Sequence, residues 1–492
     1  MTIKLLTLAA RDAKPMLSRL QEIAGRDLEI AFHLGDSEAD IKASSLSKMT
    51  AQRGRKGHLM DGKRFTAARH AAMTDPDYLS QMEAFIDHLQ RRAAPYRYTS
   101  HNLQNLQDYI DYYHILFDAA ADQIIQSGAT HMLFFNIPHM GYDTVFYQAG
   151  KALGLKPLLL NQSLFPGRFF SMPAPEAYGR FTPHFDPDMI HPIQKGEPMD
   201  LFYMKNIKQE QGAPGRINAK GLWNLFSYIV TKDPAKALNP VWLVRTLKRM
   251  QAIYGAFPDW RDPFSRFFHV NNLAYFEHLA EYEQTPIELD KKFVYFPLQL
   301  QPEMTTSALG GKYRDQALAI EDLASILPPD VLIYVKENPK QLGFARGPMF
   351  FHRLNRIPNV RIMPSYANTH ALSDAALCIA SITGTAGWEA ICKGKPAICF
   401  GDTWYQSLPG VTRFDESTRW EDVVSTEIDH DRLQQAMGSL MARSHEGVLY
   451  RHYKKIAPDF DLDRNADAVA RTIYGIMKGD TPYSFTLPEA QT

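Results

Sequence analysis

The sequence has few cysteines, and those it has are not placed to build a disulfide framework. Cys378, Cys392 and Cys399 are odd in number and lie in apolar surroundings. Such a set indicates buried free thiols in a reducing compartment. The three lack the spacing of zinc ligands and have no histidine pair beside them, so the sequence predicts no metal site.

Net charge and long apolar runs are also missing. Lys plus Arg and Asp plus Glu both count 54 in 492 residues, so no global field attracts nucleic acid, and an anionic ligand needs a local site. The apolar run at residues 5–10 is too short for a signal peptide. No run approaches the ~20 residues that a membrane-spanning helix needs. These features predict a soluble, cytoplasmic protein without a nucleic-acid partner.

What the chain does have is a repeated alternation of short apolar strands and helices, which predicts open parallel sheets. In the first half the expected elements are strands at 3–9, 28–34, 130–136 and 156–161 and helices at 15–23, within 77–126 and at 143–153. In the second half they are strands at 293–296, 331–335, 360–362, 374–380 and 396–400 and helices at 315–326, 350–354, 369–373, 388–393 and 465–477, the last with Asn465 as its cap.

The weakly periodic, Pro-, His- and Asp-rich stretch after residue 172 separates two such units. We therefore expect an α/β protein with two Rossmann-like, doubly wound parallel-sheet domains and a helical insertion between them. The expected boundaries are 1–180 for the N-terminal, acceptor-side domain, 181–285 for the linker and helical insertion, 286–462 for the C-terminal, nucleotide-sugar-binding domain, and 463–492 for a terminal helix and tail.

A basic amphipathic helix is expected at 241–254, inside the insertion. It carries Arg245, Lys248 and Arg249. A structural helix with a solvated basic face is the favoured interpretation. Peripheral contact with the inner membrane, or with an anionic lipid-linked acceptor, is the alternative.

The run from Ser381 to Ala390 (SITGTAGWEA) is the most informative stretch. Gly384 and Gly387 allow the backbone to approach a ligand closely. Thr383 and Thr385 add hydroxyl donors, and the helix expected from Trp388 offers unpaired N–H groups and a positive dipole end. The run predicts either a phosphate cradle or a tight βα turn that needs glycine only for packing, and the two interpretations weigh equally.

Two more loops with polar side chains follow strands of the second domain. One holds Gln299, Gln301 and Glu303, and the other runs from Lys336 through Asn338 to Pro339. Because the carboxyl ends of parallel strands meet at one edge of a sheet, we expect these loops to converge on the Gly/Thr run.

Two carboxylates in these loops are candidates for chemistry. Glu303 is the best catalytic carboxylate of the chain, as a base or a nucleophile. An exposed loop acid is the alternative. Glu389, expected in the first helical turn, is either an acceptor for a ribose hydroxyl or an acid that favours the helix N-terminus.

The first domain offers three cleft candidates by the same strand-end argument. Asn136 and His139 follow the strand at 130–136, and Arg168 follows another loop after a strand. We expect them on the acceptor side. For His139, a loop histidine without chemistry is an equally weighted interpretation.

In this order the motifs resemble those of the bacterial capsule polysaccharide synthesis family. The matching segments, which cover residues 290–415 well and the N-terminal domain only in outline, are Phe296–Gln299, Gln301–Glu303, Val335–Pro339 and Ile382–Ala390. The family includes the retaining β-Kdo transferases of capsule assembly, which use CMP-Kdo. The resemblance implies a GT-B-type pair of domains with the nucleotide on the C-terminal one.

The resemblance also implies roles for single residues. The family's acidic residue after the Gln loop falls on Glu303, and its Ser/Thr loop falls on Thr383 and Thr385. The family's His-Pro motif, whose histidine contacts the nucleotide phosphate, falls on Asn338-Pro339. Since asparagine cannot be cationic, Lys336 is expected to share the phosphate, and this departure bears on CMP-Kdo as the donor.

The expected function is therefore that of a glycosyltransferase of bacterial surface polysaccharide. It would transfer a sugar, such as Kdo from CMP-Kdo, to a glycan or lipid-linked acceptor, with no cofactor besides the nucleotide-sugar donor. Two alternatives stay open. One is a sugar-nucleotide epimerase of similar architecture, and the other is a non-catalytic polysaccharide-binding or assembly subunit with a decayed nucleotide site.

Overall fold

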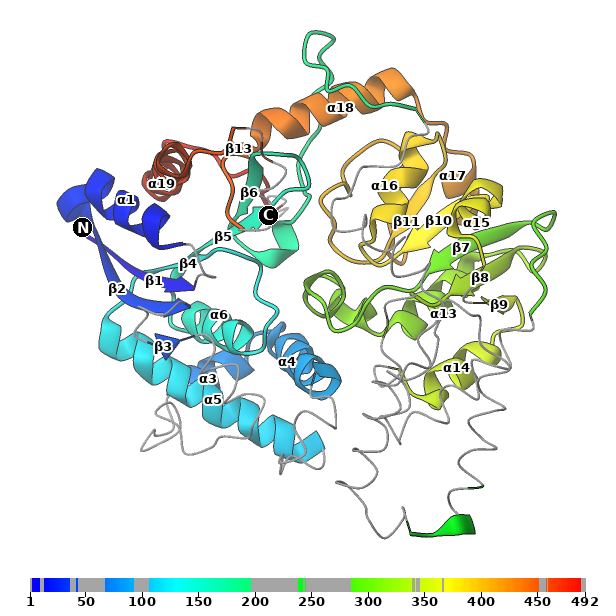
Figure 1. The fold of residues 1–492 in the computed structure, drawn as a ribbon, viewed down its shortest axis with the longest axis horizontal. Helices are drawn as coiled ribbons and strands as arrows, with labels where there is room; N and C mark the ends of the chain where they lie inside the picture. Colours follow the sequence, from blue (N-terminus) through cyan, green and yellow to red (C-terminus); the bar gives the residue numbers. More distant parts are fainter. Residues whose placement is uncertain are drawn as a thin grey trace.

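The computed structural model contains two α/β domains that lie side by side (Figure 1). It describes residues 2–8, 13–35, 41–42, 67–92, 106–195, 238–241, 244, 285–338, 341, 346–364, 367–450, 457 and 459–487. Nearly all of the expected helical insertion, with its basic helix, therefore lies outside the described residues. Pro339 lies outside them as well.

The first domain is built on a seven-stranded sheet with the order β13-β6-β5-β4-β1-β2-β3. Its elements are β1 (Ile3–Leu8), α1 (Lys14–Ala24), β2 (Leu28–Gly35), β3 (Ile41–Lys42), α3 (Ala67–Met73), α4 (Tyr78–Arg92), α5 (Leu106–Ser127), β4 (His131–Phe134), α6 (Tyr142–Ala152), β5 (Lys156–Gln162) and β6 (Arg168–Met172). Strands β1 to β5 pair in parallel, whereas β6 and β13 are antiparallel. Arg168 follows the loop after β5, as expected, and is the first residue of β6.

Successive side chains of β1 point to opposite faces of the first sheet. Leu5 packs in the core beneath α1, whereas Leu6 and Leu8 pack in the core beneath α5 and α6. This period of two is the property of a strand that is buried on both faces. The figure shows helices on both sides of the sheet accordingly (Figure 1).

The second domain has a six-stranded sheet, all parallel, with the order β12-β11-β10-β7-β8-β9. Its elements are β7 (Phe293–Pro297), the π-helix η4 (Met304–Ala308), the 3-10 helix η5 (Gly311–Arg314), α13 (Gln316–Ile326), β8 (Leu332–Lys336), α14 (Pro348–Asn355), β9 (Val360–Met363), α15 (Thr369–Ala375), β10 (Cys378–Ser381), α16 (Thr385–Cys392), β11 (Ala397–Cys399), β12 (Val411–Arg413) and α17 (Trp420–Val424). The expected Rossmann-like alternation is confirmed in both domains.

Two local expectations in the second domain are wrong at their boundaries. The strand expected from residue 374 begins at Cys378, because Asp374 and Ala375 still belong to α15. The helix expected from Trp388 begins at Thr385. The three cysteines are buried free thiols, as expected.

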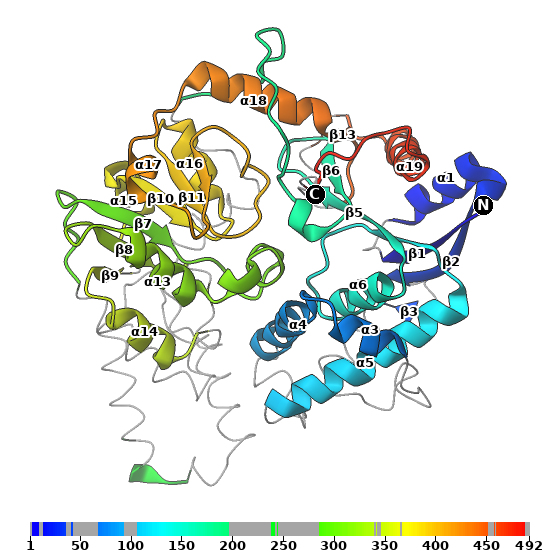
Figure 2. The same ribbon diagram turned by 180° about the vertical axis from the view of Figure 1, so that it is seen from behind.

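The chain returns to the first domain after α18 (His430–Arg443). Strand β13 (His445–Glu446) pairs with β6, and α19 (Leu462–Lys478) packs on α1, beside which it lies in both views (Figures 1 and 2). The expected capping role of Asn465 is wrong. Asp461 caps α19 by accepting from Arg464 N at 2.7 Å, while Asn465 sits inside the helix and bonds Val448.

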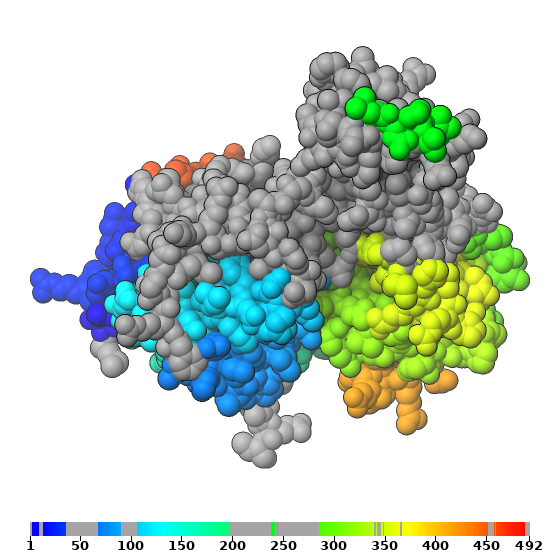
Figure 3. Space-filling model, turned by 90° about the horizontal axis from the view of Figure 1, so that it is seen from below, coloured from blue at the N-terminus to red at the C-terminus, as the bar shows by residue number. Residues whose placement is uncertain are grey.

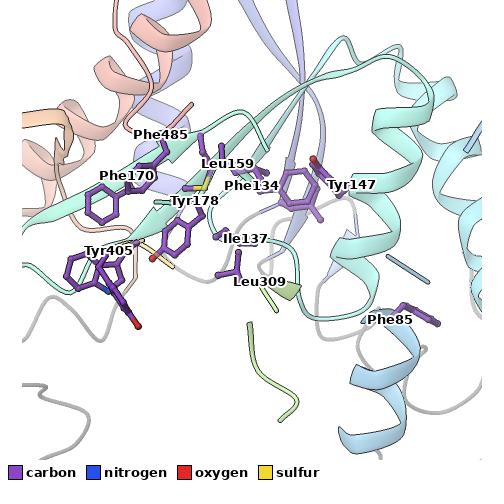
Figure 4. Close-up of a cluster of buried hydrophobic side chains, with 14 of the residues drawn as sticks. Phe85, Phe134, Ile137, Tyr147, Leu159, Phe170, Tyr178, Leu309, Tyr405 and Phe485 are labelled. Carbon is purple, nitrogen blue, oxygen red and sulfur yellow. The ribbon is translucent and has the colours of Figure 1, made fainter. Parts of the chain in front are cut away.

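A shared apolar core joins the two domains. Leu309 of the second domain lies near Ile137 and Tyr178 of the first (Figure 4). The Phe165 ring meets Trp404 edge-on, with centroids 5.5 Å apart. Seen from below, the surfaces around α4 and α5 lie alongside the second domain (Figure 3). This packing brings the loops at the strand ends of the two sheets together.

Candidate functional site

The loop after β7 and the loop after β10 are joined by side-chain hydrogen bonds. Oε1 of Gln299 accepts from the Thr383 N–H at 3.2 Å and from Thr383 Oγ1 at 3.4 Å. Thr383 Oγ1 lies 2.6 Å from the Thr305 carbonyl oxygen, to which it can also donate. Gln299 and Thr383 are both buried, so these bonds are shielded from water.

The loop after β8 joins the same group. Gln301 and Gln341 exchange two hydrogen bonds of 2.9 Å between backbone and side chain. Arg346 donates to the Gln299 carbonyl at 2.5 Å, and its Nε lies 3.3 Å from Glu337 Oε2. The structure thus brings the three predicted loops of the second domain to one edge of its sheet.

The N-terminus of α16 is the part of this edge best suited to an anion. Its N-cap, Gly384, provides no side-chain cap, and Gly384, Thr385 and Ala386 are partly exposed. Gln299 is 9% exposed, and its Nε2 is buried without a hydrogen-bond partner among the described residues. That amide lies over Gly384, where a Cβ would overlap it. A buried donor and a partly exposed, uncapped helix N-terminus therefore lie side by side.

At Gly384 and Gly387, a side chain from elsewhere in the chain lies so close to the backbone that a Cβ would overlap it. Besides the contact at Gly384, a Cβ on Gly387 would overlap Oη of Tyr405. The Tyr405 hydroxyl donates to the Gly384 carbonyl and so holds the N-cap of α16 in place. Tyr405 gave no signal in the sequence, because its partner lies 21 residues away.

Glu389 is not in the first turn, because α16 begins at Thr385. Burial raises the pKa of its carboxyl group, while the charges of His370 and Lys393 act in the opposite direction. Its position in the second turn removes the interpretation as a simple dipole partner. The role in binding a ribose hydroxyl stays a prediction.

Glu303, Lys336 and Asn338 lie at the same edge in different surroundings. Glu303 is exposed, and its carbonyl accepts from Thr306 N and Ser307 N at the start of η4. The Lys336 side chain is buried, with 5% exposure, and Asn338 N donates to Glu337 Oε1 at 2.7 Å. Their predicted roles in catalysis and donor binding stay predictions.

Helix α4 of the first domain contacts the segment after β7, which is one of the three polar loops of the second domain (after β7, β8 and β10; the donor-side loops below). The sequence did not indicate these contacts. Asp87 Oδ2 accepts from Ser307 Oγ at 2.6 Å and from Gln301 Nε2 at 3.3 Å. Arg314, which is 8% exposed, donates to Glu83 at 2.9 Å and to Ser80 at 2.9 Å. The sequence could not indicate these contacts, because nothing in an expected amphipathic helix shows that Asp87 or Glu83 has a partner more than 200 residues away.

The facing edge of the first domain carries a smaller polar cluster. Asn161 Nδ2 donates to Asn136 Oδ1 at 3.0 Å and lies 3.5 Å from the sulfur of Met304 in η4. Tyr178 donates to Asn161 Oδ1 at 3.1 Å. Asn136 was predicted here. Asn161 and Tyr178 were missed, although Asn161 lies in a strand whose end could have been examined in the same way.

His139 lies in the same loop as Asn136, whereas Arg168 does not join them. The His139 backbone N–H donates to Asp143 Oδ2 at 3.0 Å, and its Nδ1 lies 2.7 Å from the Ile137 carbonyl. Arg168 begins β6 opposite Glu446 of β13. Among the described residues, no side-chain hydrogen bond connects Arg168 with Asn136 or His139.

The described ranges contain neither a candidate metal site nor a helix suited to span a membrane. No cluster of three or more His, Cys, Asp or Glu side chains there could hold a metal ion. Within the same ranges, no helix has the length and apolar character required to cross a membrane.

A family model matches part of the chain. Residues 270–453 match the model described as "Capsule polysaccharide biosynthesis protein". This confirms the resemblance over that stretch, which contains all three donor-side loops. No curated protein matches the chain by sequence.

Solved structures give only distant likenesses. The β-Kdo 2,7 transferase of Thermosulfurimonas dismutans KpsC is 12% identical, covering 75% of this chain and 90% of that one, with a TM-score of 0.28. The β-Kdo 2,4 transferase of the same protein is 13% identical, covering 63% and 79%, with a TM-score of 0.24. UDP-GlcNAc 2-epimerase from Neisseria meningitidis bound to UDP-GlcNAc is 10% identical, covering 97% and 100%, with a TM-score of 0.21. At these scores none of them decides between a transferase and an epimerase.

Proposed function

Because residues 270–453 match the capsule polysaccharide biosynthesis family, we propose that the protein is a nucleotide-sugar-dependent glycosyltransferase of surface polysaccharide assembly. The donor binds the second domain, and the acceptor glycan or lipid-linked glycan enters from the first. A CMP-linked sugar such as CMP-Kdo is the donor that the motif resemblance favours. A cytoplasmic site of action is part of the same proposal.

The observation that carries this proposal is the pairing of Gln299 with the N-terminus of α16. Gln299 Nε2 is a buried donor without a partner among the described residues, and it lies over the uncapped Gly384. Leaving such a donor unsatisfied costs about 1–3 kcal/mol, which a bound phosphate oxygen would recover. In this proposal the donor phosphate binds at the partly exposed N-terminus of α16, beside the Gln299 amide.

The remaining loop residues surround this phosphate in the proposal. Lys336 supplies a positive charge that asparagine at 338 cannot provide. Glu389 accepts from the ribose. Glu303 is exposed at the start of η4, so its carboxylate is open to the sugar, where it acts as nucleophile or base.

Nucleotide binding tests the donor site. Titration calorimetry with CMP, UDP and GDP should show binding of one of them to the wild-type protein. Gly384→Ala should weaken that binding at least about tenfold, because the new methyl group displaces the Gln299 amide. Gly347→Ala is the matched control, since a Cβ there meets nothing within 4 Å. Wild-type protein that binds none of the three nucleotides would favour the non-catalytic subunit instead.

Transfer tests the catalytic assignment. Glu303→Gln should abolish transfer from CMP-Kdo to a fluorescent Kdo glycoside while leaving nucleotide binding intact, because the amide keeps the shape but loses the charge. Wild-type rates in this variant would remove Glu303 from the mechanism. A new nucleotide sugar formed from UDP-GlcNAc without acceptor would support the epimerase.

A further inference from the structure

The loop 136–141 of the first domain faces the segment that follows Glu303. Ile137 lies beside Leu309, the residue that ends η4 (Figure 4). Asn161, bonded to Asn136, approaches the sulfur of Met304 at the start of η4. The loop therefore packs against η4, the short helix for which Glu303 is the N-cap.

This loop is held by a buried carboxylate. Asp143, which is 8% exposed, accepts hydrogen bonds from the N–H groups of His139 (3.0 Å), Met140 (2.6 Å) and Thr144 (2.8 Å). Gly141 follows with φ +89°, and a Cβ there would contact Phe85 and His88 of α4. The backbone of His139 is thus fixed by the start of α6 and packed against α4.

The hydrogen bond of the His139 ring determines its tautomer. Nδ1 lies 2.7 Å from the Ile137 carbonyl oxygen, which can only accept, so Nδ1 carries the proton. With the Nδ1 proton held in this way, Nε2 is the nitrogen that can take up a further proton. The side chain is partly exposed, and within the described part of the chain no partner occupies Nε2. This is the form that a general base requires.

We propose that His139 is the general base that activates the acceptor hydroxyl, which assigns Glu303 the role of nucleophile. The acceptor O–H proton moves to Nε2 as the acceptor oxygen forms its bond to the anomeric carbon. The bond from that carbon to its leaving group breaks, and the leaving group keeps the electron pair. The resulting imidazolium then loses its proton to water. This inference rests on the proposed glycosyltransferase function and adds a residue to it.

Asn136 completes the arrangement. Its Oδ1 is already used by the Ile137 N–H at 2.9 Å and by Asn161 Nδ2 at 3.0 Å, which leaves its Nδ2 to donate. Asn136 is exposed at the same edge. An amide donor and a basic nitrogen three residues apart suit a sugar that presents one accepting oxygen and one hydroxyl group to be deprotonated.

The test compares three variants of the full-length protein, with CMP-Kdo as donor and a fluorescent Kdo glycoside as acceptor. His139→Gln should lower the transfer rate at least about 100-fold, the usual contribution of a general base. Nucleotide binding should stay within about twofold of wild type, which also shows that the variant folds. His139→Ala should recover part of its rate when imidazole is added.

His131→Gln is the matched control, because His131 lies at the opposite end of β4 and is likewise partly exposed. Its transfer rate should equal that of wild type. Transfer by His139→Gln at the wild-type rate, or no response of His139→Ala to imidazole, would overturn the role of His139 alone. Wild-type protein that transfers no sugar would overturn the proposed function together with this inference.

Discussion

The strand-end loops of the two sheets face each other, but they differ in how deeply their polar side chains are buried. The edge of the second domain is a network of buried polar side chains, among which Gln301, Gln316, Glu337 and Arg346 are each at most 5% exposed. The facing edge of the first domain buries Asn161, Tyr178 and Asp143, but it leaves Asn136 exposed and His139 partly exposed.

The difference indicates which edge is fixed in shape and which is adaptable. A buried polar network is costly unless every member is satisfied, and a satisfied network holds a single geometry. A donor phosphate, which every sugar of one nucleotide class shares, suits the fixed edge. An exposed edge with few donors tolerates the greater variety of acceptor glycans.

The largest expected effect comes from breaking the network of the second domain. Arg346→Leu leaves the buried Glu337 carboxylate without the cation 3.3 Å away, which should cost about 3–5 kcal/mol of unfolding free energy. Urea unfolding measures it. Lys292→Leu, at an exposed ion pair with Asp330, should cost at most about 1 kcal/mol. If Asn161→Ala in the first domain cost as much as Arg346→Leu, the contrast between the edges would be lost.

Low pH should destabilise the first domain. Burial, with a smaller contribution from the charge of Arg168, lowers the pKa of His445 to about 4 from its ordinary 6.5. The unfolded chain binds this proton first, so stability should fall as the pH drops from 6.5 to 4, by roughly 3 kcal/mol. The difference in unfolding free energy between wild type and His445→Gln isolates this contribution. A difference that does not change with pH would contradict it.

A smaller effect should follow from loosening the contact between the edges. Asp87→Asn removes the charge that accepts from Ser307 and Gln301, a bond worth about 1.5–3 kcal/mol. Because Asp87 bonds Gln301 and Ser307 in the loop after β7, the KM for the donor should rise about tenfold while the KM for the acceptor stays near wild type. Gln107→Ala, at an exposed site on α5, is the control. Equal changes in both KM values would indicate a general loss of structure.

The sequence predicted the elements well wherever side-chain period and punctuation agreed. The period of two in β1 and the buried strand at β4 located the first sheet, and Gly394 marked the end of α16. It predicted that the three donor-side loops meet, because parallel strands end at one edge. Boundaries failed where no residue signals them. The start of α16 depends on Gln299 and Tyr405, which contact Gly384 from distant parts of the chain.

The amino-acid order by itself determined the two parallel sheets and the polar loops at their ends, because period, glycine and strand direction are local properties. Only the tertiary structure decided which side chains meet. Asp87 on Ser307, Asn161 on Asn136 and Gln299 over Gly384 each join segments that have no shared pattern in the sequence. Such contacts depend on how the domains pack, and packing is a property of the whole chain.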